Sequence, residues 1–387
     1  MRRPVRISLL LAGLLACGGC ATVSDAIDAM NPFAASGPKM AELTSFTPTV
    51  EIKPEWRASL GKAGNYVLVP AVVGGSVFVA DGEGNLVRFD NGAQAWRINA
   101  GQSLSGGVGS DGKLVVVGTP KGDVLAFAAQ DGKPLWQAKV SSEVLAPPAV
   151  GDNGVAVRSG DNRISLLDVA DGKRKWIYQR PTPSLSLRSI AAPVFSDRYV
   201  FAGFPGGKLV ALALNNGGPV WEGTVALPKG ATELDRVADV VAPPVVDGRQ
   251  VCAAAFQGRV ACFDLGQGGN LLWARDFSSA AGIALDGRYL FLTDDNGAVH
   301  ALDRSSGASV WKQDKLAHRR VSGPAVRRGL VAVGDAKGVL HFLSREDGSF
   351  AARYNAEGGA IAAAPQVVGS GFLIQTQGGG VAALGVE

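Results

Sequence analysis

Tryptophan recurs along this chain at a nearly constant interval. The steps between successive tryptophans are 40, 40, 40, 45, 52 and 38 residues, and the series uses every tryptophan in the sequence: Trp56, Trp96, Trp136, Trp176, Trp221, Trp273 and Trp311. A period near 40 residues indicates one supersecondary unit copied along the chain, and each copy must stack on its neighbours because it cannot bury its apolar face alone. Function is therefore expected where the copies depart from the repeat.

Each repeat contains two short, β-branched apolar runs that flank a glycine-bearing turn. One copy places Leu114–Gly118 before Val124–Phe127, and the pair Asp131-Gly132 then leads to Trp136. Such runs predict hairpins rather than helices. A segment before the first run, such as Ala146–Val150, and another at the tryptophan bring the number of strands to four. Four-stranded units of this length, arranged radially, are propeller blades.

The two ends of the chain determine the number of blades. The last hairpin, Phe372–Thr376 with Val381–Leu384, has no tryptophan strand after it, and the strand at Trp56 has no hairpin before it. Joining these segments completes one blade and removes the free sheet edges. A further repeat carries Ala352 at the tryptophan position. We therefore predict an all-β fold, an eight-bladed propeller of four-stranded antiparallel blades over residues 51–387, closed by the N-terminal strand and the C-terminal hairpin.

Residues 1–16 have the features of a lipoprotein signal peptide. A basic start precedes an apolar core that is too short to span a bilayer. The run Leu14-Leu15-Ala16-Cys17 resembles the bacterial lipobox, so lipidation is expected at Cys17, with Cys20 or an ordinary secretory signal as alternatives. Neither cysteine precedes the Asp that retains lipoproteins in the inner membrane, which predicts attachment to the outer membrane, facing the periplasm. Residues 17–50 lack the repeat and are predicted to be the lipidated N-terminus and a flexible tether.

Charge and cysteine content narrow the class of protein further. The formal charge of +4 falls to +1 once the three arginines of the signal are removed, which does not suggest a nucleic-acid binder. The two cysteines after the signal, Cys252 and Cys262, lie on the two runs of one hairpin. In an oxidising compartment a cross-strand disulfide is expected, with buried free thiols as the alternative.

The chain shows no recognisable catalytic or metal-binding constellation. His300 and His341 occupy the same position in consecutive repeats and are interpreted as strand residues, whereas His318-Arg319-Arg320 is interpreted as a solvated basic turn. Four aspartates end a hairpin run before a glycine-containing turn and are expected to bond their own backbone: Asp90, Asp168, Asp264 and Asp303. Zinc, phosphate-loop and nucleophile-elbow motifs are missing. Neither enzymatic activity nor a cofactor is therefore expected.

Two successive repeats are longer than 40 residues, and the excess lies in residues 180–192 and 226–242. Both segments join equivalent strands of adjacent blades, so they are expected side by side on one face, where repeat proteins commonly bind partners. They combine leucines with charges of both signs, as interface cores and rims do. The candidate contact residues are Leu185, Leu187, Arg188, Leu234, Asp235, Arg236 and Asp239. Leucines that pack beneath the loop are the alternative interpretation.

Together the lipobox, the tryptophan repeats, Ser184–Arg188 and Glu233–Arg236 resemble the BamB family, the propeller lipoproteins of the outer-membrane β-barrel assembly machinery. The resemblance implies a non-catalytic scaffold that binds a periplasmic POTRA domain of BamA, the barrel-forming subunit, and assists insertion of outer-membrane proteins. It also implies that Leu185, Leu187, Arg188 and Asp239 contact the partner. Val241 stands where the family shows a second acidic residue, and Asp235 is the candidate substitute.

Further hypotheses concern the ligands of the ring. Exposed strand edges are a hypothetical site for unfolded outer-membrane proteins, by strand addition.

A dehydrogenase dependent on pyrroloquinoline quinone (PQQ) is the alternative function if the protein is an enzyme, because the blades of such enzymes carry the same tryptophan motif. Such enzymes are much longer and carry extra loops with a metal site, a catalytic Asp and often adjacent cysteines, which are missing here. A propeller that binds peptidoglycan or a small ligand through the basic stretch 318–328 is the other alternative.

Overall fold

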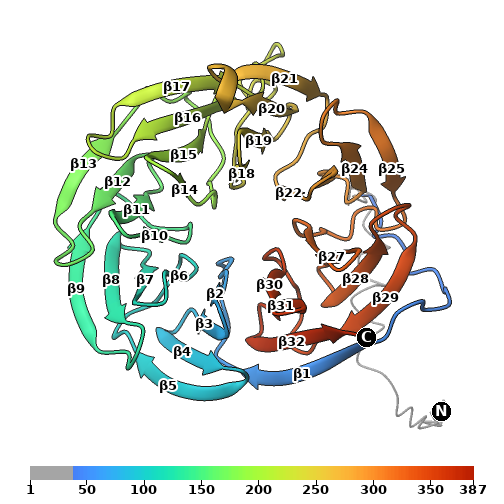
Figure 1. Cartoon of the computed structure of the whole chain (residues 1–387), viewed down its shortest axis with the longest axis horizontal. Coiled ribbons are helices and arrows are strands. Elements are labelled where there is room, and N and C mark those ends of the chain that lie inside the picture. Colours follow the sequence, from blue (N-terminus) through green and yellow to red (C-terminus); the bar gives the residue numbers. More distant parts are fainter. Residues whose placement is uncertain (1–37) are drawn as a thin grey trace, which may run out of the picture. The chain divides into compact units, whose positions relative to one another are not determined.

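Thirty-two strands form eight four-stranded antiparallel sheets, and the sheets are arranged around a central opening (Figure 1). The computed structural model describes residues 38–387, of which Met40–Glu387 form one compact unit. The predicted eight-bladed, all-β propeller is confirmed. The signal peptide and both candidate lipidation sites, Cys17 and Cys20, lie outside the described residues.

The strands are named by their order in the chain. The innermost strands are β2 (Ala71–Val73), β6 (Gly109–Ser110), β10 (Ala149–Gly151), β14 (Val194–Ser196), β18 (Val245–Asp247), β22 (Ile283–Leu285), β26 (Ala325–Arg327) and β30 (Gln366–Val368). The second strands are β3 (Ser76–Ala80), β7 (Leu114–Gly118), β11 (Gly154–Arg158), β15 (Tyr199–Phe204), β19 (Gln250–Ala254), β23 (Tyr289–Thr293), β27 (Leu330–Gly334) and β31 (Gly371–Gln375). The third strands are β4 (Asn85–Asp90), β8 (Asp123–Ala128), β12 (Ile164–Leu167), β16 (Lys208–Ala213), β20 (Val260–Asp264), β24 (Val299–Asp303), β28 (Val339–Ser344) and β32 (Gly380–Val386). The outermost strands are β5 (Ala93–Asn99), β9 (Pro134–Lys139), β13 (Arg174–Tyr178), β17 (Pro219–Thr224), β21 (Asn270–Arg275), β25 (Ser309–Gln313), β29 (Phe350–Asn355) and β1 (Ile52–Ser59).

Blades are numbered from β2. Blade 1 contains β2 to β5, each following blade takes the next four strands, and blade 8 combines β30, β31 and β32 with β1. The first strand of the chain therefore closes the ring, as predicted, by pairing antiparallel with β32 from Ile52↔Val386 to Ser59↔Gly380. Within residues 38–387 the helical content is one short 3₁₀ turn, η1 (Leu265–Gln267), and no helix has the length and hydrophobicity to cross a membrane.

The repeated tryptophan ties each blade to the next one. Six of the seven indole N–H groups donate to a backbone carbonyl between the third and fourth strands of the following blade, as Trp136 does to Val169 at 2.8 Å. The ring lies against the glycine of that turn. For Gly172, which has a φ of 72°, an added Cβ would lie 2.6 Å from the Trp136 ring. Glycine is needed there both for the left-handed backbone and for the close approach.

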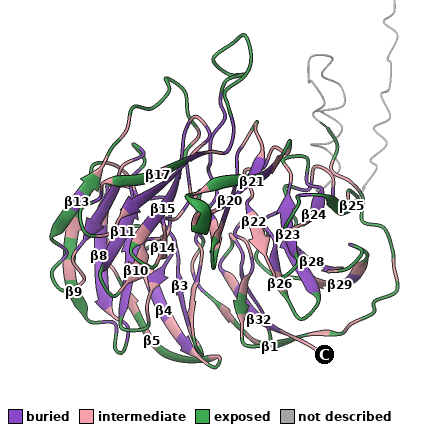
Figure 2. Ribbon diagram, turned by 45° about the horizontal axis from the view of Figure 1, so that its top comes forward, coloured by how far each residue is buried: buried purple, intermediate pink, exposed green. Residues whose placement is uncertain are grey.

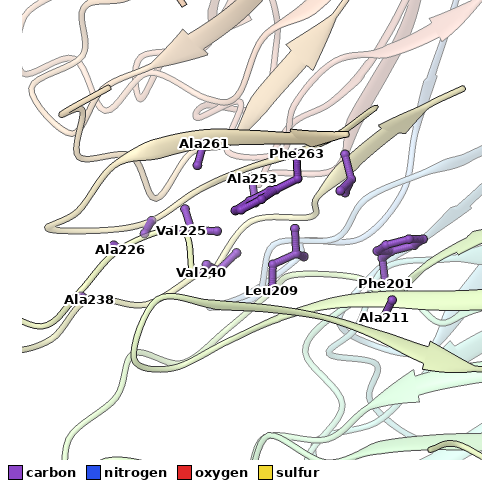
Figure 3. Close-up of a cluster of buried hydrophobic side chains, with 12 residues drawn as sticks. Phe201, Leu209, Ala211, Val225, Ala226, Ala238, Val240, Ala253, Ala261 and Phe263 are labelled. Atoms are coloured by element: carbon purple, nitrogen blue, oxygen red, sulfur yellow. The ribbon is translucent and has the colours of Figure 1, made fainter. Parts of the chain in front are cut away.

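Apolar side chains fill the space between neighbouring blades. The second and third strands, such as β8, β11 and β15, are buried, whereas the outermost strands β13, β17 and β21 are largely exposed (Figure 2). Between blades 4 and 5, Phe201 and Leu209 face Phe263, and Val225 and Val240 pack into the same cluster (Figure 3). The ends of the 226–242 segment are fixed to the ring because this core includes Val225, Ala226, Ala238 and Val240.

The segment Met40–Val50 belongs to the propeller unit, which corrects the expected boundary of the tether at residue 50. Ala41 N donates to Ala317 O and Thr49 N to Ala351 O, both at 2.9 Å. Phe46 stacks on Phe350 with 5.5 Å between ring centroids. We call Met40–Val50 the strap. Its backbone carbonyls also accept hydrogen bonds from arginines of blade 7 and of the loop before it.

Candidate partner-binding site

The two long connections leave the ring at adjacent positions. Insert 1, residues 180–192, joins β13 to β14, and insert 2, residues 226–242, joins β17 to β18. Both run from an outermost strand to the innermost strand of the next blade, so the repeat places them on the same face. A hydrogen bond joins them directly, because Leu187 N in insert 1 donates to Asp239 Oδ2 in insert 2 at 2.8 Å. The expectation that the inserts lie side by side is confirmed.

Asp239 organises this junction from beneath. Its other carboxylate oxygen accepts from Gly206 N at 3.0 Å, in the turn between β15 and β16, and its carbonyl accepts from Phe256 N at 2.9 Å. Only 1% of the residue is exposed. The expectation of a direct partner contact by Asp239 is therefore corrected: its carboxylate is used inside the propeller, where it holds three segments together. Val241, which stands where the family shows a second acidic residue, is buried as well.

The other candidate residues remain accessible. Leu185 and Leu234 are 43% and 71% exposed, and Leu187 is half-buried. Leu185 and Leu234 therefore do not pack beneath their loops, and the alternative interpretation is wrong for these two residues. Leu227, at the start of insert 2, is 57% exposed. Isolated exposed leucines are common on protein surfaces, but three exposed leucines and one half-buried leucine on two linked loops are typical of an interface.

Arg188 has a defined orientation although its side chain is 70% exposed. Its Nε and Nη2 atoms donate to Glu143 Oε1 at 3.1 and 2.7 Å. Glu143 lies in the connection between blades 2 and 3, and its carbonyl accepts from Gly160 N at 2.7 Å. An exposed ion pair adds little to stability, but it fixes where the guanidinium points. The surface therefore extends over a third connection.

The apex of insert 2 is a single tight turn. Asp235 Oδ2 accepts from Thr232 N, and Thr232 Oγ1 accepts from Asp235 N, both at 3.1 Å. These contacts with Thr232 lower the pKa of Asp235, so its carboxylate stays charged. Arg236 Nε donates to Gly230 O at 3.1 Å. Leu234, Asp235 and Arg236 thus project from a closed turn, with charges of both signs beside the leucine.

We call the exposed part of this region the insert surface. It consists of Leu185, Leu187, Arg188, Leu227, Leu234, Asp235 and Arg236. Sequence reasoning missed Leu227 and Glu143. Leu227 lies inside the predicted insert but in no recognised pattern, and Glu143 belongs to a connection of ordinary length. Only the spatial proximity of consecutive inter-blade loops brings Glu143 to Arg188.

The expected disulfide and the turn aspartates lie outside the inserts. Cys252 and Cys262 face each other across β19 and β20 and form a disulfide. The aspartates before the turns accept backbone N–H groups as expected at three positions: Asp168, Asp264 and Asp303. Asp90 differs, because it accepts from Ser76 Oγ and Arg88 Nε instead of its own backbone. Both donors contact the same carboxylate oxygen, Oδ1.

The histidines and the basic loop are structural. His300 and His341 lie on β24 and β28, as predicted, and each bonds an aspartate of the preceding turn through Nε2. Arg319 is 5% exposed, and its Nε donates to Asp335 Oδ2 at 2.7 Å. The interpretation of this loop as solvated is therefore wrong for Arg319, because the strap covers it. Among residues 38–387, no cluster of side chains has the arrangement of a metal site.

The axial opening contains a hollow of about 590 Å³. Residues that immediately precede the innermost strands line it, among them Val69, Pro147, Pro243 and Ala281, and the charged side chains are Asp294, Asp295 and Arg320. Small apolar residues contributed by every blade offer few directional contacts. The geometry therefore favours the insert surface, rather than the hollow, as the site of specific recognition.

Comparison with known proteins identifies the family. Residues 82–313 match the family model described as outer membrane protein assembly factor BamB. The BamB of Bordetella pertussis (strain Tohama I) is 43% identical over 379 residues, which cover 97% of this chain and 96% of that relative. The crystal structure of BamB from Moraxella catarrhalis superposes with a TM-score of 0.81 at 28% identity, covering 87% of this chain and 100% of that one.

The dehydrogenase alternative has support only at the level of fold. A quinohemoprotein alcohol dehydrogenase from Comamonas testosteroni superposes with a TM-score of 0.69, but at 14% identity. At that identity the likeness shows a shared propeller and nothing about chemistry. Three relatives whose matches cover at least 96% of this chain are named outer membrane protein assembly factor BamB. The chain belongs to the BamB family of outer membrane protein assembly factors.

Proposed function

We propose that this assembly factor is a lipid-anchored scaffold that binds a periplasmic POTRA domain of BamA through the insert surface. The observation that carries the proposal is the junction at Asp239, which locks two irregular loops into one platform of exposed leucines and charges. Recognition is concentrated there because the rest of the ring repeats the same blade. The scaffold orients its partner within the assembly machinery while that partner inserts β-barrel proteins.

The chemistry of the insert surface supports a protein partner. Burying a leucine that is otherwise exposed contributes roughly 1.5–3 kcal/mol, so Leu185, Leu187 and Leu234 can supply the apolar centre of an interface. Arg188 and Arg236 lie beside them and can pair with acidic groups of the partner at the rim. Since both loops are held by hydrogen bonds before binding, little conformational entropy is lost on association.

We further propose that the anchor is the lipid on Cys17, with Cys20 as the alternative, at the periplasmic face of the outer membrane. The strap supports this arrangement. Its first residue with a backbone bond to the ring, Ala41, contacts Ala317, which lies in the connection between β25 and β26. That connection is of the same class as the two inserts and emerges on the same face of the ring. The strap thus makes its first backbone bond to the ring at the face that carries the insert surface.

A second proposed activity is transient binding of unfolded outer-membrane proteins. The outermost strands have free edges and carry exposed apolar side chains: Leu135 on β9 and Val220 on β17 are each 54% exposed, and Leu271 on β21 is 51% exposed. An extended client segment can add to such an edge by main-chain hydrogen bonds. Photo-crosslinkers placed beside Leu135 and Val220 should capture unfolded client. Absence of adducts at both positions would argue against this activity.

The test of the main proposal is a matched pair of variants. Leu187→Ala combined with Arg188→Ala removes one apolar and one charged contact of the insert surface and should abolish co-purification with the barrel-forming subunit. The control is Val310→Ala, on the exposed face of β25, which is 42% exposed and lies in blade 6. Its co-purification should be unchanged. Normal recovery of the partner with the double variant, at wild-type folding, would move the interface elsewhere.

A further inference from the structure

One position of the blade is occupied by a charged residue only once. The position lies at the end of the second strand, opposite the start of the third strand. It is the last paired residue in Gly118↔Val124 and Arg158↔Ile164, and in Gly203↔Leu209 one further pair, Phe204↔Lys208, follows it. In the order of the blades this position holds Ala80, Gly118, Arg158, Gly203, Ala254, Thr293, Gly334 and Gln375. Arg158 is therefore a departure from the repeat in its own right, and it lies in the blade that precedes insert 1.

In the blades with glycine, this position receives an apolar side chain from the next inter-blade connection. A Cβ added to Gly118 would lie 2.3 Å from Val144, and one added to Gly203 would lie 2.2 Å from Val240. The valine stands five residues before the innermost strand in both cases. The equivalent residue of insert 1 is Ser189. Insert 1 has thus lost the glycine and valine contact that anchors other connections.

Arg158 replaces that contact with directional hydrogen bonds. Its Nε donates to Ala191 O at 2.9 Å, its Nη2 donates to Gly203 O, and its Nη1 contacts Asn162 Oδ1 at 3.4 Å. The guanidinium carbon lies 5.1 Å from the centre of the Phe204 ring. The side chain is fully buried, and among residues 38–387 its hydrogen-bond partners are two backbone carbonyls and one side-chain amide, with no carboxylate.

Arg158 remains a cation in this setting. Burial lowers the pKa of Arg158 to about 10, which still leaves it protonated at neutral pH. A buried charge without a counter-ion is costly, and a glycine is tolerated at the same position in three other blades. Packing of the ring alone therefore does not account for an arginine here. Its hydrogen bond to Ala191 O points instead to the loop.

The start of insert 1 lies over the Phe204 ring, and its end is held by Arg158, which packs on the same ring. Arg180, at the start of the insert, lies 5.6 Å from the centre of Phe204, and Arg158 on that ring holds Ala191 at the end. Between these two ends, Leu187 is held by Asp239. We propose that Arg158 is a positioning residue for partner binding, which fixes insert 1 so that Leu187 and Arg188 stand in the binding arrangement. This inference rests on the proposed function of the insert surface.

The test gives blade 3 the glycine and valine that other blades have at these two positions. Arg158→Gly combined with Ser189→Val rebuilds the glycine and valine pair found at Gly118 with Val144, so the ring is expected to fold with a melting temperature at or above that of the wild type. Binding to the periplasmic domain of the barrel-forming subunit should weaken about tenfold if the binding-competent loop population falls to about a tenth. Arg158→Lys keeps the charge but not the planar fork, and should weaken binding less.

Hydrogen exchange separates a positioning role from a packing role. In the double variant the amides of residues 182–191 should exchange faster, while those of β11 and β15 keep their protection. Loss of protection in both strands with unchanged protection in the loop would overturn the proposal, as would wild-type affinity of both Arg158 variants. The Leu187→Ala, Arg188→Ala variant is measured alongside. If it too binds normally, the proposed function has failed; if it alone binds weakly, only the role of Arg158 has failed.

Discussion

His341 is buried between groups that determine its protonation. Arg353 Nε donates to its Nδ1 at 3.2 Å, so that nitrogen carries no proton, and Nε2 must donate to Asp335 Oδ2 at 3.0 Å. Burial lowers the pKa of His341 below 6.5, and the bond to Asp335 offsets this only partly. Burial would raise the pKa of Asp335, but hydrogen bonds from His341, Val339 and Arg319 lower it to about 2. The neutral imidazole beside Arg319 and Arg353 is thus part of the native network.

This arrangement predicts acid sensitivity in a defined pH range. The unfolded chain takes up a proton at His341 near pH 6.5, before the folded chain does, so stability falls as the pH drops below 6.5. The loss is at most about 1.4 kcal/mol per pH unit for one proton. The contribution of Asp335, whose pKa is lowered, is lost only as the pH falls from 3.8 towards 2 and does not overlap.

The measurement is urea unfolding at pH 7.5 and 5.5. Glutamine offers an acceptor and a donor without titrating, so His341→Gln should reduce the difference in unfolding free energy between the two pH values. An undiminished difference in the variant would assign the acid sensitivity to other groups.

Individual site residues differ in how far sequence could predict them. Leu185 and Leu234 were identified by their place in long connections, and both are exposed. Asp239 was placed in the right loop but given the wrong role, because sequence does not show which side of an irregular loop faces the ring. Arg158 went unrecognised although an alignment of the eight second strands reveals it. Its side-chain direction, towards insert 1, follows only from the fold.

At the level of the strand, the tryptophan of one blade and the turn of the next blade form one joint between the two blades. Trp136 supplies a flat surface and an N–H, and the turn at Gly172 supplies a close-packing backbone and the carbonyl of Val169. This explains the missing tryptophan at Ala352. In the following blade the third and fourth strands are β32 and β1, which are not consecutive in the chain, so no turn joins them to receive an indole. Val50 and Ile52 pack against the cluster around Ala352 instead.

Trp136 and Trp56 allow the hydrogen bond of this joint to be compared with its packing. Trp136→Phe keeps the aromatic contact and loses the hydrogen bond to Val169, so it should destabilise the ring by about 1 kcal/mol, the usual net value of such a bond. Trp56 packs on Gly92 in the same way, but the six indole hydrogen bonds within residues 38–387 all come from the other tryptophans. Trp56→Phe should therefore cost less. Equal losses in denaturant unfolding of both variants would show that packing alone supplies the stabilisation.

The blades were predictable because each local signal agreed with the others. Spacing of tryptophans, β-branched runs and glycine turns all indicated the same unit, and the ends of the chain indicated closure. The strap was not predicted because it lacks the repeat and resembles a linker in composition. Its order depends on Arg319 and Arg353, which lie about 300 residues further along the chain and donate to the carbonyls of Ala41 and Thr44.

For the molecule as a whole, stability depends on closing the ring. Each blade buries its two faces against neighbours, so an opening between any two blades exposes a core cluster on both sides. The joint lies within blade 8, where β1 covers the edge of β32 and Lys53 Nζ lies 2.7 Å from Glu387 Oε2. The exposed ion pair contributes little. The strand pairing from Ile52 to Ser59 is what prevents β32 from becoming a free edge.

Stepwise truncation separates the strap from the closure. A chain that begins at residue 38 retains both and is the reference. A chain that begins at residue 51 loses the strap and its backbone bonds to Ala317 and Ala351, and Arg319 loses the Ala41 carbonyl as its acceptor. This form should therefore melt several degrees lower than the reference and remain monomeric. A chain that begins at residue 60 also loses β1. Its blade 8 exposes β32, and it should melt far lower and associate through that edge, as seen by calorimetry and light scattering. If the form lacking β1 remained monomeric with the melting temperature of the form lacking only the strap, closure by β1 would not be what stabilises the ring.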